Sequence, residues 1–250
     1  MYRKGDHTRN FHRIAETKRI LVLVMFFIAF VPCKPQTILG TSGMMNIPSA
    51  DMRAAGTFDG GASFVQKDLL WNKTYNTGIY YVSLTPFSWV ELTFRHTLFK
   101  IRKSKLEPND SIFQQDRSLS VRLRPIAEGK YWPSIVVGAN DIFSDHGEGK
   151  YACIYGVATK HFPIASVGTI ETTVGYAFRR KRGITHDGVM GGVSFSPAFF
   201  PDMRVMGEYD THGYNFGIGA FLFRHLNLTC FTREFSGVNA TVSYQYTIPY

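Results

Sequence analysis

The sequence predicts an all-β fold: an antiparallel transmembrane β-barrel of about 12 strands, of the outer-membrane type, after a cleaved signal peptide. Three observations predict it. The chain begins with a basic stretch and a short apolar run, turn-forming residues divide the remainder into β-rich segments, and the last segment alternates strictly between apolar and polar residues. A closed sheet is required because every backbone polar group must be paired inside hydrocarbon.

The first element is the predicted signal peptide. Residues 1–19 carry six basic and two acidic side chains, and residues 20–31 form an unbroken apolar run of twelve. A spanning helix needs about 20 apolar residues, so this run fits the hydrophobic region of an export signal. Removal of residues 1–33 would lower the formal charge from +9 to +5. We therefore expect no nucleic-acid partner.

Cleavage is predicted after Cys33, because small or branched residues are wanted at the positions that Val31 and Cys33 occupy. Acylation of Cys33 as a lipoprotein is the alternative, disfavoured by Pro32, and a retained short anchor ranks last. Pro48 keeps the segment that follows out of the sheet, and we expect this segment to pack against the periplasmic mouth. The predicted regions are a signal peptide over 1–33, a periplasmic N-terminal segment over 34–56 and the outer-membrane barrel over 57–250.

The barrel region shows no sustained 3.6-residue apolar period, so helices are expected to be absent or short. Its even number of segments returns both ends of the barrel to one side. Compact links with Pro or aromatic residues alternate with longer polar links, of which residues 100–116 form the longest, and we place the longer links on the outer side. The segments lie near 57–66, 74–84, 89–100, 117–127, 133–142, 150–160, 167–178, 188–196, 203–211, 214–222, 226–234 and 238–250.

Alternation assigns the faces of these segments. Apolar positions should face lipid and polar positions the lumen, because a charge on the lipid face near the midplane costs about 2–4 kcal/mol. Segments 57–66, 74–84 and 133–142 alternate poorly, and their faces stay unassigned. The charged side chains assigned to the lumen are Arg95, Arg122, Arg124, Arg204, Glu91, Glu171, Glu208 and Asp210.

Two interpretations of these lumen charges stay open. Unpaired charges in a confined space are costly, so the first is a ladder of ion pairs that fills a narrow barrel, which we favour. The second is a polar track for a hydrophilic substrate. Cys153 and Cys230 share the phase of apolar neighbours, so both are assigned to the lipid face and no disulfide is expected.

The last segment, 238–250, gives the clearest alternation and ends on an aromatic residue at the carboxyl terminus. It should pair with segment 57–66 to close the barrel, because an open edge in lipid leaves amides unsatisfied. A terminal aromatic strand is also what the barrel-assembly machinery engages. The residues predicted to form this assembly signal are Tyr246, Ile248 and Tyr250.

Three further stretches stand out as motifs: residues 40–57, 115–141 and 207–217. The residues that carry them are Gly40, Gly43, Pro48, Ser49, Ala50, Gly56, Asp116, Arg117, Tyr209 and Asn215. In this order they resemble the YjbH family of exopolysaccharide-biosynthesis outer-membrane proteins, over about residues 37–250. Family members can be much longer, with a second barrel-like region, for which this chain has no room.

The resemblance implies a barrel in the outer membrane of a Gram-negative bacterium that takes part in exopolysaccharide or capsule biosynthesis or export, as a conduit or a scaffold. Its partners would be outer-membrane lipid, the barrel-assembly machinery, exopolysaccharide and other secretion proteins. Arg117, Arg122 and Arg124 offer planar donor groups, suited to the carboxylates of Glu208 and Asp210 or to an acidic sugar.

Two other functions compete with this hypothesis. Barrels of this size include hydrolases that act on lipid or glycan, but the sequence lacks Gly-x-Ser-x-Gly, His-Glu-x-x-His and Cys/His metal spacing. We therefore predict no enzyme activity, no cofactor and no metal. A narrow general porin is the third hypothesis, although charged side chains would crowd its lumen. A continuous polar track would favour passage, and a closed lumen would favour a scaffold.

Overall fold

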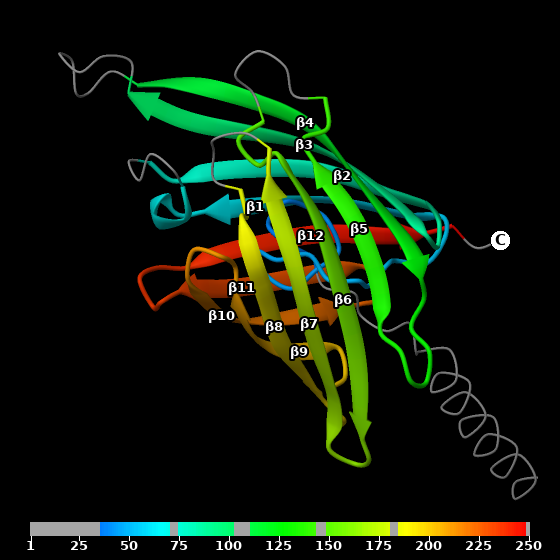
Figure 1. Ribbon diagram of the computed structural model, residues 1–250. Coiled ribbons are helices and arrows are strands. Elements are labelled where there is room, and N and C mark those ends of the chain that lie inside the picture. Colours follow the sequence, from blue (N-terminus) through cyan, green and yellow to red (C-terminus); the bar gives the residue numbers. More distant parts are fainter. Residues whose placement is uncertain (1–35, 71–74, 103–110, 144–148, 181–184, 249–250) are drawn as a thin grey trace, which may run out of the picture. The chain divides into compact units, whose positions relative to one another are not determined.

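The computed structural model describes residues 36–70, 75–102, 111–143, 149–180 and 185–248. The predicted signal peptide and Tyr250 lie outside these residues. The chain forms one closed barrel of twelve antiparallel strands, each paired with its neighbours in the sequence, so the all-β prediction is confirmed (Figure 1). The strands are β1 (Thr57–Val65), β2 (Thr77–Phe87), β3 (Val90–Arg102), β4 (Ser111–Ile126), β5 (Ser134–Asn140), β6 (Cys153–Ile164), β7 (Gly168–Arg179), β8 (Gly188–Pro197), β9 (Met203–Tyr209), β10 (Tyr214–Leu222), β11 (Leu226–Arg233) and β12 (Asn239–Thr247).

The barrel closes between its first and last strands. β1 pairs antiparallel with β12, in a register that runs from Thr57 opposite Thr247 to Phe64 opposite Ala240. This pairing leaves no free sheet edge, as the alternation of the last segment predicted. No helix among the described residues is long and apolar enough to cross a membrane.

The two ends of the barrel differ in their connections. Links of a few residues join β2 to β3, β6 to β7 and β10 to β11 at one end, where β1 begins and β12 ends; we call this the turn end. The opposite end, the loop end, carries the links after β1, β3, β5, β7, β9 and β11. One predicted boundary was wrong: β4 begins at Ser111, opposite Arg102, so most of the predicted 100–116 link is paired strand.

The two faces of the sheet follow the predicted alternation in most strands. In β12, Asn239, Thr241 and Ser243 are buried in the lumen, while Val242 and Tyr244 are about half exposed on the outside. In β3, Glu91 and Arg95 are fully buried and Phe94 is exposed. Apolar and aromatic side chains therefore cover the outer surface, and polar side chains line the wall inside.

The assignment of Cys153 to the lipid face was wrong. Cys153, Tyr155 and Val157 point into the barrel and are buried, whereas Ile154 between them is exposed. Both faces of β6 are apolar at these positions, so parity could not distinguish the inside from the outside. Cys230 does lie on the exposed face, and both cysteines are free.

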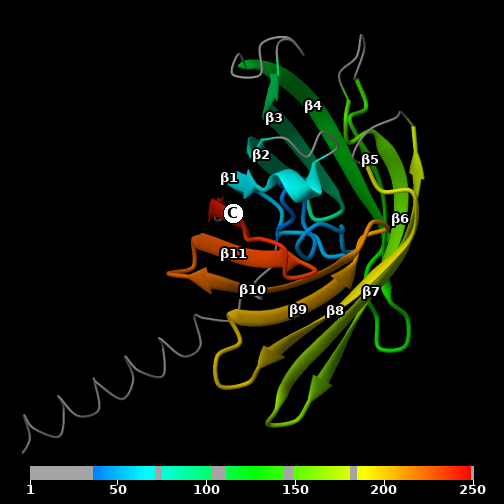
Figure 2. The ribbon, with the colours of Figure 1, turned by 90° about the vertical axis from the view of Figure 1, so that its left-hand side faces the viewer.

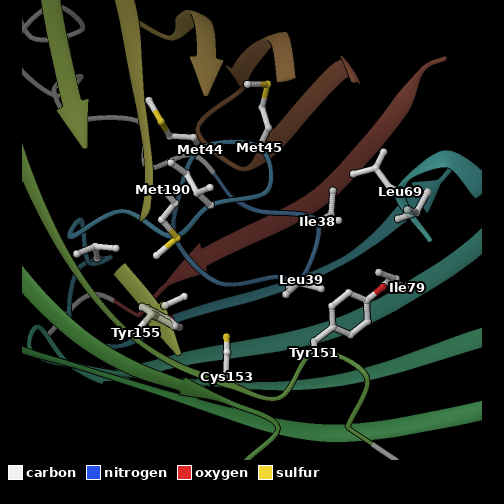
Figure 3. Packing of buried hydrophobic residues seen from close by; sticks show 14 of the residues in the cluster. Ile38, Leu39, Met44, Met45, Leu69, Ile79, Tyr151, Cys153, Tyr155 and Met190 are labelled. Carbon is white, nitrogen blue, oxygen red and sulfur yellow. The ribbon is translucent and has the colours of Figure 1, made fainter. Parts of the chain in front are cut away.

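Residues 36–53, which we call the plug, occupy the lumen. Every residue of this segment is buried, and Figure 2 shows its blue trace surrounded by strands. The segment therefore fills the barrel, in contrast to the predicted packing against one mouth. Its apolar side chains supply the core: Ile38, Leu39, Met44 and Met45 pack with inward-facing wall residues such as Met190 (Figure 3).

Glycines on the wall make room for the plug. Gly192 in β8 and Gly217 in β10 face inward, and a Cβ atom at either position would lie 2.6 Å from the sulfur of Met44 or Met45, respectively. A side chain at these positions would collide with the plug, because ordinary carbon–sulfur contacts are longer. The wall and the plug are thus matched in shape along β8 and β10.

Candidate functional site

The first contact between plug and wall is centred on the Glu91 carboxylate in β3. It accepts hydrogen bonds from the Ser42 amide at 2.9 Å and the Ser42 hydroxyl at 2.5 Å. The Arg122 guanidinium of β4 donates to it at 2.9 Å, and Arg53 of the plug lies 3.0 Å away. Arg53 also lies 3.2 Å from Asp59 in β1. Two arginines and two carboxylates thus neutralise each other in a buried cluster.

Arg122 binds the plug backbone as well as Glu91. Its second terminal nitrogen donates to the carbonyl oxygen of Ser49 and, at 3.2 Å, to that of Asp51. This arginine is fully buried. It therefore fixes the motif residues Pro48, Ser49 and Ala50 against β4, and it acts as a structural clamp.

The second contact is centred on Glu208 in β9. Its carboxylate accepts from the backbone amides of Met45 at 3.0 Å, Asn46 at 2.7 Å and Ile47 at 3.4 Å. The Asn215 side chain donates to it at 2.8 Å. A tight turn of the plug thus wraps its N–H groups around one buried carboxyl group, in the arrangement that polypeptide turns use to bind anions.

Asp210, just after β9, extends this contact. It accepts from the side chains of Asn46 at 2.5 Å and Asn215 at 2.9 Å, and it pairs with Arg233. Burial opposes ionisation of Asp210, but the Arg233 guanidinium and His186 outweigh this effect and lower its pKa. The carboxylate therefore stays charged and holds the plug at neutral pH.

His186 bridges the same region. Its Nδ1 lies 2.8 Å from the carbonyl oxygen of Asp210, and its Nε2 lies 3.1 Å from the carbonyl oxygen of Asn46 in the plug. Burial lowers the pKa of His186. The neutral ring can donate to only one of the two oxygens.

A third cluster supports the loop end. Arg95 in β3 lies 2.7 Å from Asp141 and 3.7 Å from Asp116, and its guanidinium stacks 4.3 Å from the centre of the Tyr151 ring. Asp116 in turn accepts a hydrogen bond from the backbone amide of Gly149 at 2.9 Å. These contacts tie Asp141, Gly149 and Tyr151, which lie between β5 and β6, to β3 and β4 on the inner wall.

A fourth cluster lies toward the turn end, around His161 in β6. Its Nδ1 is 2.6 Å from Glu128, and its Nε2 is 3.5 Å from Asp51 and 3.8 Å from Glu171. One ligand atom each from Asp51, His161 and Glu171 lies within 4.8 Å of the others, a spacing that a divalent cation could use. Arg204 is 2.9 Å from Glu171 and already supplies positive charge there.

The remaining predicted residues divide between the two faces. Arg124 is half-buried beside the irregular β4–β5 pairing. Arg117 is exposed and donates to its neighbour Gln115, so its proposed contact with Glu208 and Asp210 was wrong. Tyr209 is exposed, whereas Asn215 is buried beside Glu208. Gly40 and Gly56 have φ angles of 86° and 73° and end turns in the chain before β1.

Several residues of these clusters were missed from the sequence. Arg53 belongs to the segment that was placed outside the barrel, and Asp59 lies in a strand whose alternation Gly60 and Gly61 interrupt. His186 and Arg233 were assigned to a loop and a strand end without a role. The charges of Arg53 and Asp59, close to the Gly60–Gly61 pair, were the available signal, but they did not indicate a partner residue.

A cavity of about 440 Å³ opens at the loop end. The plug forms its floor through Ile38, Leu39 and Asn46. Links from five of the six hairpins at that end contribute to its walls, among them Tyr151, His186 and Arg233. Among the described residues, this cavity forms a recess of the lumen above the plug.

The family described as exopolysaccharide biosynthesis protein YbjH matches residues 36–184, which is more than half of the chain. The chain belongs to the YjbH family. The match begins at the first residue of the plug and extends past β7, so the plug and the wall that binds it through Glu91 and Arg122 are part of the shared region. A search of curated proteins found no match. The family assigns the chain a role in exopolysaccharide biosynthesis.

Proposed function

We propose that this YjbH-family protein is a plugged barrel of the outer membrane that serves exopolysaccharide secretion as a scaffold, without conducting the polymer through its own lumen. The observation that carries the proposal is the filling of the lumen by residues 36–53, all of which are buried. A closed lumen favours a scaffold over a conduit or a porin, because a polymer strand would have to displace the plug.

The outer surface supports placement in a lipid bilayer. Phe58, Phe94, Val174, Ile218 and Tyr244 are each more than two-fifths exposed, and they come from strands all around the barrel. Such exposure would be unfavourable in water, but it suits the apolar band of an outer-membrane barrel. The inner charges, in contrast, are paired across the wall and with the plug.

The plug is held from many sides at once, which argues against its routine release. In addition to Glu91 and Glu208, the hydroxyls of Ser63, Ser83 and Ser134 donate to plug carbonyl oxygens at 2.9, 2.7 and 2.9 Å. Removal of the plug would take both Ser42 donors from Glu91 and three backbone amides from Glu208 in a confined space, which is strongly unfavourable.

The side-chain contacts also favour a protein without catalytic activity. His161 contacts carboxylates, and His186 and His225 contact backbone carbonyl oxygens. Cys153 is buried within the wall. None of these contacts joins a nucleophile to a general base in the way that an acyl or glycosyl hydrolase needs. His212 does lie 3.1 Å from the hydroxyl of its neighbour Thr211, at an exposed position.

A gene deletion tests the proposed role. We expect the deletion strain to lose most of its secreted exopolysaccharide, measured as polymer in the medium and on the cell surface, and to regain it with the wild-type gene. A complementing Arg117→Ala variant, changed only on the outer face, should restore output fully. Unchanged polymer output in the deletion strain would refute a role in secretion.

A further inference from the structure

The cavity above the plug has the composition of a binding site. Its volume of about 440 Å³ lies in the range typical of small-molecule sites, about 300–1,000 Å³. Its floor and one side are apolar, formed by Ile38, Leu39 and Leu69. Its rim carries side chains of both signs, including Asp68 and Arg233. An apolar floor beneath a polar rim suits a ligand with both kinds of surface.

Two residues that line the cavity each hold a buried polar atom without a hydrogen-bond partner. These atoms are the side-chain oxygen of Asn140 and the hydroxyl of Tyr151, and both residues are only 4% exposed. Buried polar atoms usually have partners, so these two residues are candidates to bind a polar group that enters the cavity. Burial raises the pKa of Tyr151, which therefore keeps its proton and can donate. Asn140 offers an acceptor.

The charge balance narrows the chemical class of the ligand. Asp68 and Glu234 are acidic, while the charge of Arg233 is already engaged by Asp210 and burial lowers the pKa of His186. The cavity therefore presents no uncompensated positive charge to a strongly anionic group. Hydroxyl groups, which both donate and accept, match the donor of Tyr151 and the acceptor of Asn140.

We propose that this cavity binds one or two uncharged sugar units of the secreted polysaccharide, with the apolar face of a sugar ring on Ile38 and Leu39 and its hydroxyls on Asn140 and Tyr151. This assignment rests on the proposed role in exopolysaccharide secretion. The plug then has two roles, because it blocks the lumen and also forms the floor of the site.

The test uses the purified full-length protein in detergent and the exopolysaccharide isolated from the strain that carries the gene, with binding followed by calorimetry. We expect saturable binding by the wild type. Tyr151→Phe removes one unpartnered oxygen atom and should weaken binding at least tenfold without loss of folding, and Asn140→Ala should do the same. Tyr155→Phe is the matched control, because Tyr155 is equally buried but does not line the cavity. It should bind as the wild type does.

The outcomes separate this inference from the function on which it rests. The sugar site is refuted if the folded wild type does not bind the polymer, or if Tyr151→Phe and Asn140→Ala bind it as tightly as the wild type does. This holds even where the deletion strain loses its polymer. Competition by a neutral monosaccharide of the polymer, and not by an acidic one, supports it. A deletion strain with normal polymer output would refute the proposed function, whereas the calorimetric measurement would still decide whether the cavity binds sugar.

Discussion

At the scale of single residues, Glu91 shows how the wall holds the plug. It is fully buried and contacts Ser42 and Arg53 of the plug and Arg122 of β4. A buried carboxylate is tolerated only where such donors satisfy its lone pairs. Asp59 balances the second arginine, so the cluster is neutral as a whole.

Arg122→Leu should therefore be strongly destabilising. The variant leaves the Ser49 carbonyl oxygen without its donor and reduces the positive charge beside Glu91. We expect the free energy of unfolding to fall by about 3–5 kcal/mol, the usual effect of breaking a buried pair. Denaturant unfolding of the refolded barrel, followed by heat-modifiable gel mobility, measures it.

The control for this change is Arg117→Leu, on the outer face of the same strand. Arg117 is exposed and donates a hydrogen bond to Gln115, so its replacement should change the free energy of unfolding by less than about 1 kcal/mol. Equal effects of the two variants would contradict the assignment of inner and outer faces in β4.

His186 predicts a pH dependence of plug binding. Burial holds its pKa below the value in the unfolded chain, about 6.5, so the unfolded chain binds the additional proton. Its contribution to stability is complete above about pH 6.5 and decreases as the pH falls further. Asp210, which faces the ring, also has a lowered pKa, so its contribution decreases only in more acidic solution, below about pH 4.

Unfolding measured from pH 8 to pH 5 tests this prediction. Relative to His186→Gln, which lacks the titrating ring, the wild type should show a loss of stability between about pH 6.5 and pH 5. His212→Gln should keep it, because His212 is exposed, although its ring lies 6.3 Å from that of His186. A His186→Gln curve parallel to the wild type would show that another group is responsible.

At the scale of strands and segments, the sequence predicted what depends on local alternation. β3, β4, β7 and β12 each expose one apolar face and bury one polar face, so period-2 patterning was sufficient there. It failed in β6, because the plug makes the barrel interior apolar near Cys153 and Tyr155. An apolar residue could then face either side.

The plug itself could not be predicted from the sequence. Residues 36–53 contain turn-forming residues but no alternation, and their burial depends on contacts with Glu91, Glu208 and other residues far along the chain. The glycines and Pro48 indicated a segment outside the sheet, which was right. Its place inside the barrel is a tertiary property.

The last strand predicts an effect on assembly. Tyr246 is exposed on the outer face and lies opposite Phe58 in the closing pair of strands. Deletion of residues 246–250 should lower the amount of barrel in the outer membrane with little change in synthesis or export. A Tyr209→Ser variant, which removes an outward aromatic from β9, should assemble normally. Membrane fractionation, followed by gels on which the folded barrel changes mobility after heating, measures the amount of assembled barrel. Normal assembly of the truncated chain would contradict an assembly signal at the C-terminus.

At the scale of the whole molecule, the barrel combines a closed lumen with two unlike ends. The turn end holds both termini of the sheet, and the loop end carries the cavity above the plug. The sequence predicted the strand count, the closure and the family, because these follow from repeated local patterns and an ordered set of motifs. It did not predict the ion-pair clusters, since partners such as Arg53 and Asp59 are decided by the packing of the plug.

Conductance across a planar lipid bilayer tests the central claim most directly. The purified full-length protein, inserted from detergent, should show no steady ion conductance, because residues 36–53 fill the lumen. A variant that lacks residues 36–53 but keeps the twelve strands should conduct once it is inserted. Its conductance shows that the assay detects inserted barrels. A stable open channel in the wild-type protein, of the same size as in the variant without the plug, would contradict the account.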